Sequence, residues 1–157
     1  ETWLYFTPPI LKTEYGFFGK DNETLTYSKG DKLKNVKVGV YGPSNTSKNL
    51  NKINDAGAEL LIELFKDSKT AFKVLGLGDR LRLVFSNKDV GKAIIKKLGL
   101  NNLKYIGQYK GLSYYFAFSK SKVSQETFNK FISTYNKLKQ NGTIKKILDT
   151  YGMSEAN

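Results

Sequence analysis

The chain has 157 residues, of which 39% are hydrophobic and 25% are charged, a balance typical of a globular domain. It contains neither Cys nor His, which excludes disulfides, thiol catalysis, a Ser-His-Asp triad and His-based metal sites within the chain. Lys and Arg number 26 against 14 acids, giving a net charge of +12, but the lysines are spread along the whole sequence. We therefore expect a solvated basic surface without nucleic-acid binding. No stretch is long and apolar enough to predict stable membrane insertion.

The first half of the chain alternates between strand-like and helix-like patterns. The predicted elements are an extended segment over 1–13 that contains FTPPI, an aromatic strand over 14–19, a turn-rich segment over 21–35, a buried strand through 36–40, a helix over 44–54 and a strand over 60–65. Strands followed by short helices predict an α/β sheet, largely parallel, with helices on both faces.

The second half continues this pattern and then departs from it. The predicted elements are a helix that Asp67 or Ser68 caps, a strand over 81–85, a helix through 90–98 that Gly99 ends, strands over 103–109 and 114–118, a helix that Ser124 caps and a short helix that Thr143 caps. The last two helices have no strand between them. They are therefore expected to pack against something other than a further βα unit.

Four segments in this order resemble the C-terminal part of an extracellular solute-binding protein of family 3, the polar amino-acid receptors of bacterial ABC importers. The segments are VKVGVYGPSNTSKNL (36–50), SNKDVGKAIIKKLGL (86–100), YYFAFSK (114–120) and FNKFISTYNKLKQNGTIKKILDTYGM (128–153). FTPPI also matches the family's strand-to-turn segment in the first lobe. The resemblance implies a type II periplasmic binding protein fold, in which two α/β lobes are joined by two hinge strands.

On this resemblance, the chain comprises one complete α/β lobe and part of the second. Residues 1–19 are expected to be a remnant of lobe 1 with the first crossover, and residues 20–113 are expected to form lobe 2. Residues 114–153 would form the second crossover and helices that return to lobe 1. A full receptor carries further N-terminal residues that build most of lobe 1, and the arginine that grips the ligand carboxylate would precede Glu1.

The strongest candidate binding segment is the turn from Gly42 to Thr46. A helix N-terminus presents unpaired N–H groups and a partial positive charge, which suit a carboxylate, and Ser44, Asn45 and Thr46 add side-chain donors. The alternative is that one of these residues only caps the helix. A nucleotide loop is excluded, because the G-x-x-x-x-G-K-[ST] pattern is absent.

Asn87 and Asp89 are the second candidates, because they follow a predicted strand at the end where α/β sheets bind ligands. The resemblance places the family's ammonium-binding aspartate at Asn87, and an amide cannot supply its full charge. Asp89 therefore either takes that role or only caps the helix. The resemblance also places Thr7 near the lobe 1 wall and Tyr15 at the mouth of the cleft. Arg82, in GDRLRLV, stands where the family often has an acid that braces lobe 2.

These observations predict a receptor that binds a small polar solute, amino-acid-like or carboxylate-bearing, and delivers it to the membrane permease of an ABC importer. No cofactor, metal or catalytic residue is expected, and no enzyme activity. The protein would be periplasmic, or lipid-anchored outside a Gram-positive cell. The alternative is a ligand-sensing domain of the same fold in a signalling protein. A DNA-binding regulator is disfavoured, because no helix-turn-helix pattern is present.

Overall fold

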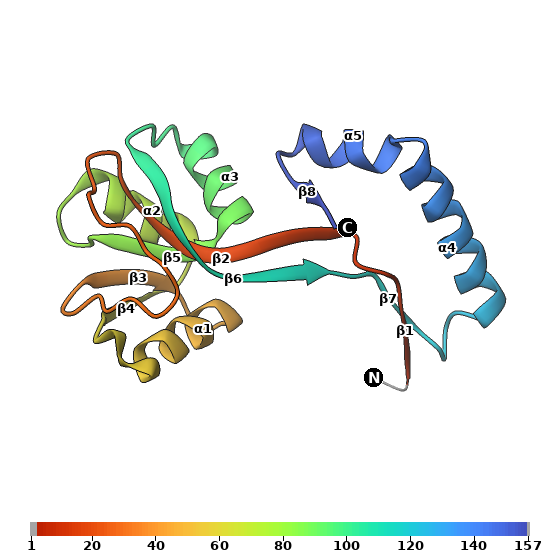
Figure 1. Ribbon diagram of the computed structural model, residues 1–157, viewed down its shortest axis with the longest axis horizontal. Helices are drawn as coiled ribbons and strands as arrows, with labels where there is room; N and C mark the ends of the chain where they lie inside the picture. The colour runs from red at the N-terminus through yellow and green to blue at the C-terminus, as the bar shows by residue number, and fades with distance from the viewer. Residues whose placement is uncertain (1–2, 157) are drawn as a thin grey trace. The chain divides into compact units, whose positions relative to one another are not determined.

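The computed structural model describes residues 3–156 and divides into two compact units. Unit 1 contains residues 3–13 and 112–156, and unit 2 contains residues 14–111. Two strands, β2 (Leu11–Lys20) and β6 (Leu103–Tyr114), have residues in both units, and they are neighbours in one sheet (Figure 1). The chain therefore passes between the units within paired strands.

Unit 2 is a sheet covered by helices on both faces. Its remaining elements are β3 (Lys37–Tyr41), α1 (Asn45–Ile53), the π-helical turn η1 (Asn54–Ala58), β4 (Leu61–Phe65), α2 (Ser68–Leu77), β5 (Leu83–Asn87) and α3 (Lys88–Leu98). The strand order is β4-β3-β5-β2-β6. β3 pairs in parallel with β4 and β5, whereas β2 pairs antiparallel with β5. The sheet is thus mixed and not largely parallel, because the strand that arrives from unit 1 runs against its neighbour.

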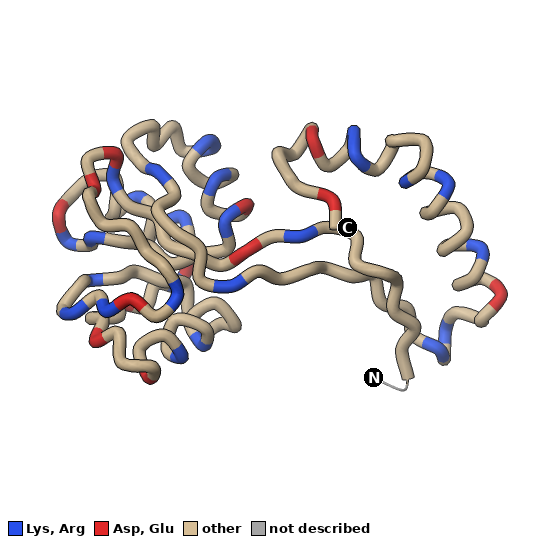
Figure 2. The backbone as a smooth tube through the Cα atoms, viewed as in Figure 1, with Lys and Arg blue, Asp and Glu red and all other residues tan. Residues whose placement is uncertain are grey.

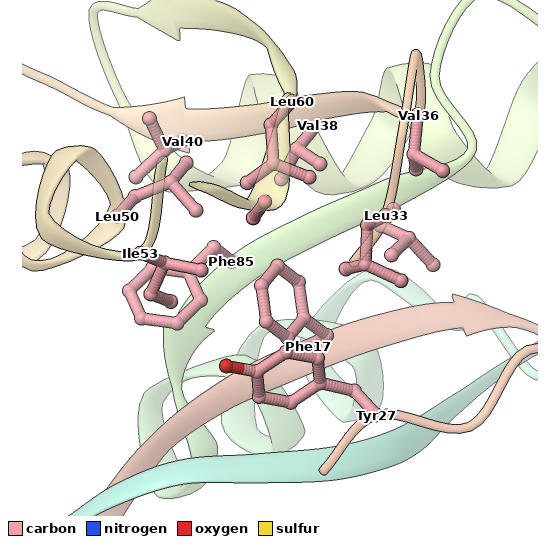
Figure 3. Close-up of a cluster of buried hydrophobic side chains, with 12 residues drawn as sticks. Phe17, Tyr27, Leu33, Val36, Val38, Val40, Leu50, Ile53, Leu60 and Phe85 are labelled. Carbon is pink, nitrogen blue, oxygen red and sulfur yellow. The ribbon is translucent and has the colours of Figure 1, made fainter. Parts of the chain in front are cut away.

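Alternation along the strands sends side chains into two separate cores. Phe17 and Phe85 point to the face that α1 covers, where they pack with Leu50 and with the valines of β3 (Figure 3). Phe18 points to the opposite face and packs with Phe72 of α2. Both cores consist mainly of side chains that are fully or nearly fully buried. The period-2 pattern thus explains how one sheet supports helices on both faces.

The helix ends follow the local chemistry of the sequence. Asp67 and Ser124 accept hydrogen bonds from the backbone of their helices, as predicted, and Gly99 ends α3 with a left-handed conformation (φ 64°). The prediction that Thr143 caps the last helix is wrong. Gly142 occupies the cap position, and Asn141 Oδ1 accepts a hydrogen bond from the Thr143 N–H at 3.0 Å.

Unit 1 is built from a two-stranded ribbon and two helices. Its elements are β1 (Leu4–Phe6), β7 (Ala117–Ser119), α4 (Gln125–Gln140), α5 (Thr143–Thr150) and β8 (Ser154–Glu155). β1 pairs antiparallel with β7. Phe128 of α4 is stacked on Tyr5 of this ribbon and meets Phe118 edge to face. β8 pairs with β2 at Leu11 and Lys12. The two consecutive helices therefore pack within unit 1 and belong to no βα unit of the main sheet.

Two properties of the whole described chain bear on its partners. Lys and Arg are spread along helices and loops of both units (Figure 2). No helix among residues 3–156 combines the length and apolar character that crossing a bilayer needs.

Candidate functional site

The predicted binding residues of unit 2 gather at one edge of its sheet. β4, β3 and β5 run parallel, so their carboxyl ends lie at the same edge. Tyr15 of the antiparallel strand β2 stands opposite Asn87 at the end of β5. The carboxyl edge, as we call it, consists of the turn 42–46, the segment 87–89 and Tyr15. The structure therefore brings together, in unit 2, candidate residues that are more than 70 positions apart in the sequence.

Ser44 uses its side chain to begin α1. Its Oγ accepts a hydrogen bond from Ser47 N at 3.2 Å and donates one to the Tyr41 carbonyl at 2.7 Å, while Ser44 N donates to Ser47 Oγ at 2.9 Å. This reciprocal pattern is a capping box. It leaves the N–H groups of Asn45 and Thr46 in the first turn, where an α-helix has no internal acceptor for them. The donors that this turn can offer to an anion are thus chiefly those of Asn45 and Thr46.

Gly42 has a packing role in the same turn. Its N–H donates to the Phe65 carbonyl at 3.0 Å and so joins the ends of β3 and β4. A Cβ at this position would lie 2.8 Å from a methyl carbon of Leu64 and 2.9 Å from Ser47 Oγ. The peptide bond from Gly42 to Pro43 is cis. Glycine is therefore required here for close packing of the turn.

The segment after β5 has divided roles. Asn87 is buried, and its Oδ1 accepts hydrogen bonds from Asp89 N at 3.0 Å and Val90 N at 3.1 Å. Asn87 therefore caps α3 and satisfies the donors of its first turn. Asp89 is not the cap: its carboxylate is partly exposed in the first turn of α3. This arrangement leaves Asp89 as the acid at the carboxyl edge that a cationic group can reach.

Tyr15 lies beside this segment and is partly buried. Its ring stacks on Phe85 with a centroid distance of 5.9 Å and an interplanar angle of 27°. The contact anchors the ring to the α1-side core while the residue keeps its place opposite Asn87. Tyr15 thus offers a rigid aromatic surface at the edge.

Thr7 belongs to unit 1 and has a structural role there. Its side chain is buried, and Oγ1 accepts a hydrogen bond from Phe116 N at 3.0 Å. Its own N–H donates to the Phe116 carbonyl at 3.0 Å. These two bonds hold the end of β1 to the segment before β7.

Sequence reasoning missed a charged cluster at the carboxyl edge, centred on Lys88. Lys88, the first residue of α3, donates from Nζ to Glu14 Oε1 at 2.9 Å and lies 4.8 Å from the centroid of the Tyr105 ring. The Tyr105 hydroxyl is buried next to Glu14, and burial, reinforced by this carboxylate, raises the Tyr105 pKa. A lysine at the first position of a helix is electrostatically unfavourable. This unfavourable position was the signal in the sequence that Lys88 has a charged partner elsewhere in the chain.

A second charged pair lies away from the carboxyl edge. Arg82 donates from Nε and Nη2 to the two carboxylate oxygens of Glu23, both at 2.9 Å. These hydrogen bonds hold the pKa of Glu23 below its ordinary value. Arg82 therefore joins the start of β5 to the segment after β2 through an ion pair with Glu23.

Comparisons with known proteins identify the fold. No family model matches the sequence, and no curated protein matches it. Solved structures do match, across nearly the whole chain. One is the second substrate-binding domain of a Streptococcus pneumoniae protein assigned to amino-acid ABC transport. It has a TM-score of 0.74 and 24% identity, and the match covers 94% of this chain and 64% of that one.

Two further matches broaden this result. An ancestral arginine-binding protein bound to arginine has a TM-score of 0.69 and 24% identity, with 94% of this chain and 64% of that one covered. A histidine kinase sensor domain with similarity to periplasmic binding proteins has a TM-score of 0.70 and 19% identity, with coverage of 98% and 65%. The chain thus spans less than two thirds of the length of each. It has the mixed α/β fold of type II periplasmic binding protein domains.

Proposed function

We propose that the protein is a solute receptor that binds a small polar, carboxylate-bearing molecule at the carboxyl edge of unit 2. The observation that carries this proposal is the open first turn of α1, where the N–H groups of Asn45 and Thr46 lack internal acceptors. The helix dipole adds a partial positive charge at this point. Both features favour a carboxylate over a neutral or cationic group.

We further propose that the solute is amino-acid-like. Asp89 lies at the same edge and can pair with an ammonium group, and Tyr15 supplies an aromatic surface beside Asn87. The names of two structural neighbours, an amino-acid transport domain and an arginine-bound protein, support the same class of ligand. In this proposal Asn87 contributes indirectly, because its side-chain oxygen caps the helix that carries Asp89.

The proposed physiological role is delivery of the solute to the permease of an ABC importer, from the periplasm or from a lipid anchor outside the cell. Binding and release require no bond-making step, so we propose no catalytic residue, cofactor or metal for this role.

Isothermal titration calorimetry with individual L-amino acids tests the proposal. We expect saturable binding of at least one amino acid, and Asp89→Asn should weaken it by about tenfold or more, since a hydrogen-bonded ion pair is lost. Asp21→Asn is the matched control, because Asp21 is an exposed acid just after the far end of β2. Equal affinity of the two variants would refute the role of Asp89, and absence of binding to any amino acid would refute the ligand class.

A sensory role is the second candidate, because the histidine kinase sensor domain matches 98% of the chain. The same ligand would then regulate a signalling partner. The sequence of the native polypeptide separates the two roles, because a sensor is continuous with a signalling domain and a receptor for an importer is not.

A further inference from the structure

The pair of Glu14 and Lys88 lies where both long strands leave unit 2. Glu14 is the first residue of unit 2 on β2, and Gly111 is its last residue on β6. Lys88 begins α3, whose first turn carries Asp89. One charged pair thus joins Lys88, within the carboxyl edge, to β2.

Lys88 is held in place by two partners from different strands. Its ammonium group donates to Glu14 of β2 at 2.9 Å and lies over the Tyr105 ring of β6. Both side chains of the ion pair are largely buried, with exposed fractions of 32% for Lys88 and 20% for Glu14. Partial burial reduces the screening of this pair by solvent and salt, so each charge depends more strongly on its partner than in a surface pair. It also offsets the unfavourable position of a cation at a helix N-terminus.

Gln108 extends the contacts of Glu14 to the end of unit 2. In the amide orientation that satisfies both of its ends, Gln108 Nε2 donates to Glu14 Oε2 at 3.3 Å, and Oε1 accepts from Gly111 N at 3.2 Å. Glu14 therefore contacts α3 through one carboxylate oxygen and β6 through the other.

On the unit 1 side, β2 is held by a different element. β8 pairs with Leu11 and Lys12, and Ala156 N donates to the Ile10 carbonyl at 3.4 Å.

We propose that Glu14 and Lys88 are positioning residues that fix the first turn of α3, and with it Asp89, to both connecting strands. The link to ligand binding rests on the proposed function, but the mechanical part does not. The pair acts through the geometry of Asp89 and does not itself contact the solute.

Amide hydrogen exchange followed by NMR on the whole chain tests the mechanical part without any ligand. Glu14→Ala and Lys88→Met should each accelerate exchange at Gly111 and Tyr15 by about fivefold, because each removes a charged partner from the cluster. The reversed pair, Glu14→Lys with Lys88→Glu, should restore most of the protection. Lys20→Met is the matched control, since it breaks the 2.7 Å pair with Asp79 at the other end of β2. Two results would overturn the inference. The exchange rates of Gly111 and Tyr15 could be unchanged in both single variants, or they could rise equally in the control.

Calorimetry on the same variants tests the link to the ligand. With an amino acid that the unmodified protein binds, each single variant should weaken affinity by about fivefold, and the reversed pair should recover it. If both single variants lose affinity and the reversed pair does not recover it, the charged side chains contact the solute directly. That result would overturn the positioning role. If no amino acid binds, the proposed function fails while the exchange experiment still decides the mechanical part.

Discussion

Gly91 offers a sharp test of how α3 is seated on the sheet. It is buried in the middle of α3, and a Cβ at this position would lie 2.4 Å from two ring carbons of Phe18 and 2.9 Å from a ring carbon of Phe72. Both rings are fully buried and meet edge to face at 5.1 Å, so neither has space to withdraw. We therefore expect Gly91→Ala to push α3 away from the sheet.

Two opposing effects set the magnitude of this change. Alanine is favoured over glycine in a helix interior by about 1 kcal/mol. Overpacking a well-packed core costs about 1–3 kcal/mol, and contacts this short against rigid rings place Gly91→Ala at the upper end. The net loss of stability is about 1–2 kcal/mol, which corresponds to a fall in Tm of roughly 2–8 °C for a chain of this size.

Urea denaturation followed by circular dichroism measures this loss. Gly76→Ala in α2 is the matched control, because the nearest atom to its Cβ would be a methyl carbon of Leu100 at 3.2 Å, well outside the 2.4 Å contacts at Gly91. We expect the control to be within about 0.5 kcal/mol of the unmodified protein. If Gly91→Ala were as stable as Gly76→Ala, the reasoning about close packing beneath α3 would be refuted.

Three other changes have distinct expected outcomes. Ser44→Ala should lower the free energy of unfolding in urea by about 1 kcal/mol, because it removes the cap of α1; unchanged stability would contradict the capping role. Thr46→Val should leave stability within about 0.5 kcal/mol but weaken amino-acid binding in calorimetry, and unchanged affinity would argue against this turn as a binding segment. The Glu23–Arg82 pair should stabilise the protein at neutral pH, because the pKa of Glu23 is lowered in the folded state. This contribution is fully present above the ordinary pKa of a glutamate and is lost as the pH falls through the lowered pKa. The stability difference between the unmodified protein and Arg82→Met should therefore shrink on acidification, and a pH-independent difference would contradict this account.

Much of unit 2 could be predicted from the sequence because its signals are local. Alternating valines mark β3, and cap residues such as Asp67 act within one helical turn of their own position. The glycine after α3 is needed at a left-handed position. The candidate residues of the carboxyl edge were also predictable, since they follow parallel strands, and the carboxyl ends of such strands meet at one edge.

The division of labour within that edge could not be predicted. Serine, asparagine and aspartate all occur often at helix caps and in binding sites. Only the hydrogen bonds show that Ser44 and Asn87 cap helices and that Asp89 does not. These residue types are compatible with capping and with ligand binding alike until the positions of the backbone N–H groups are known.

The sequence by itself determined most helices and strands of unit 2, the α/β class and the absence of cysteine and histidine chemistry. Tertiary structure alone decided which charges meet: Glu14 pairs with Lys88 across 74 positions, and Glu23 pairs with Arg82 across 59. It also decided why Gly16 must lack a side chain, since a Cβ there would lie 2.1 Å from the Tyr105 hydroxyl oxygen. The physical reason is that local patterns follow from the chain's own geometry, whereas these contacts depend on the register between strands that are distant in the sequence.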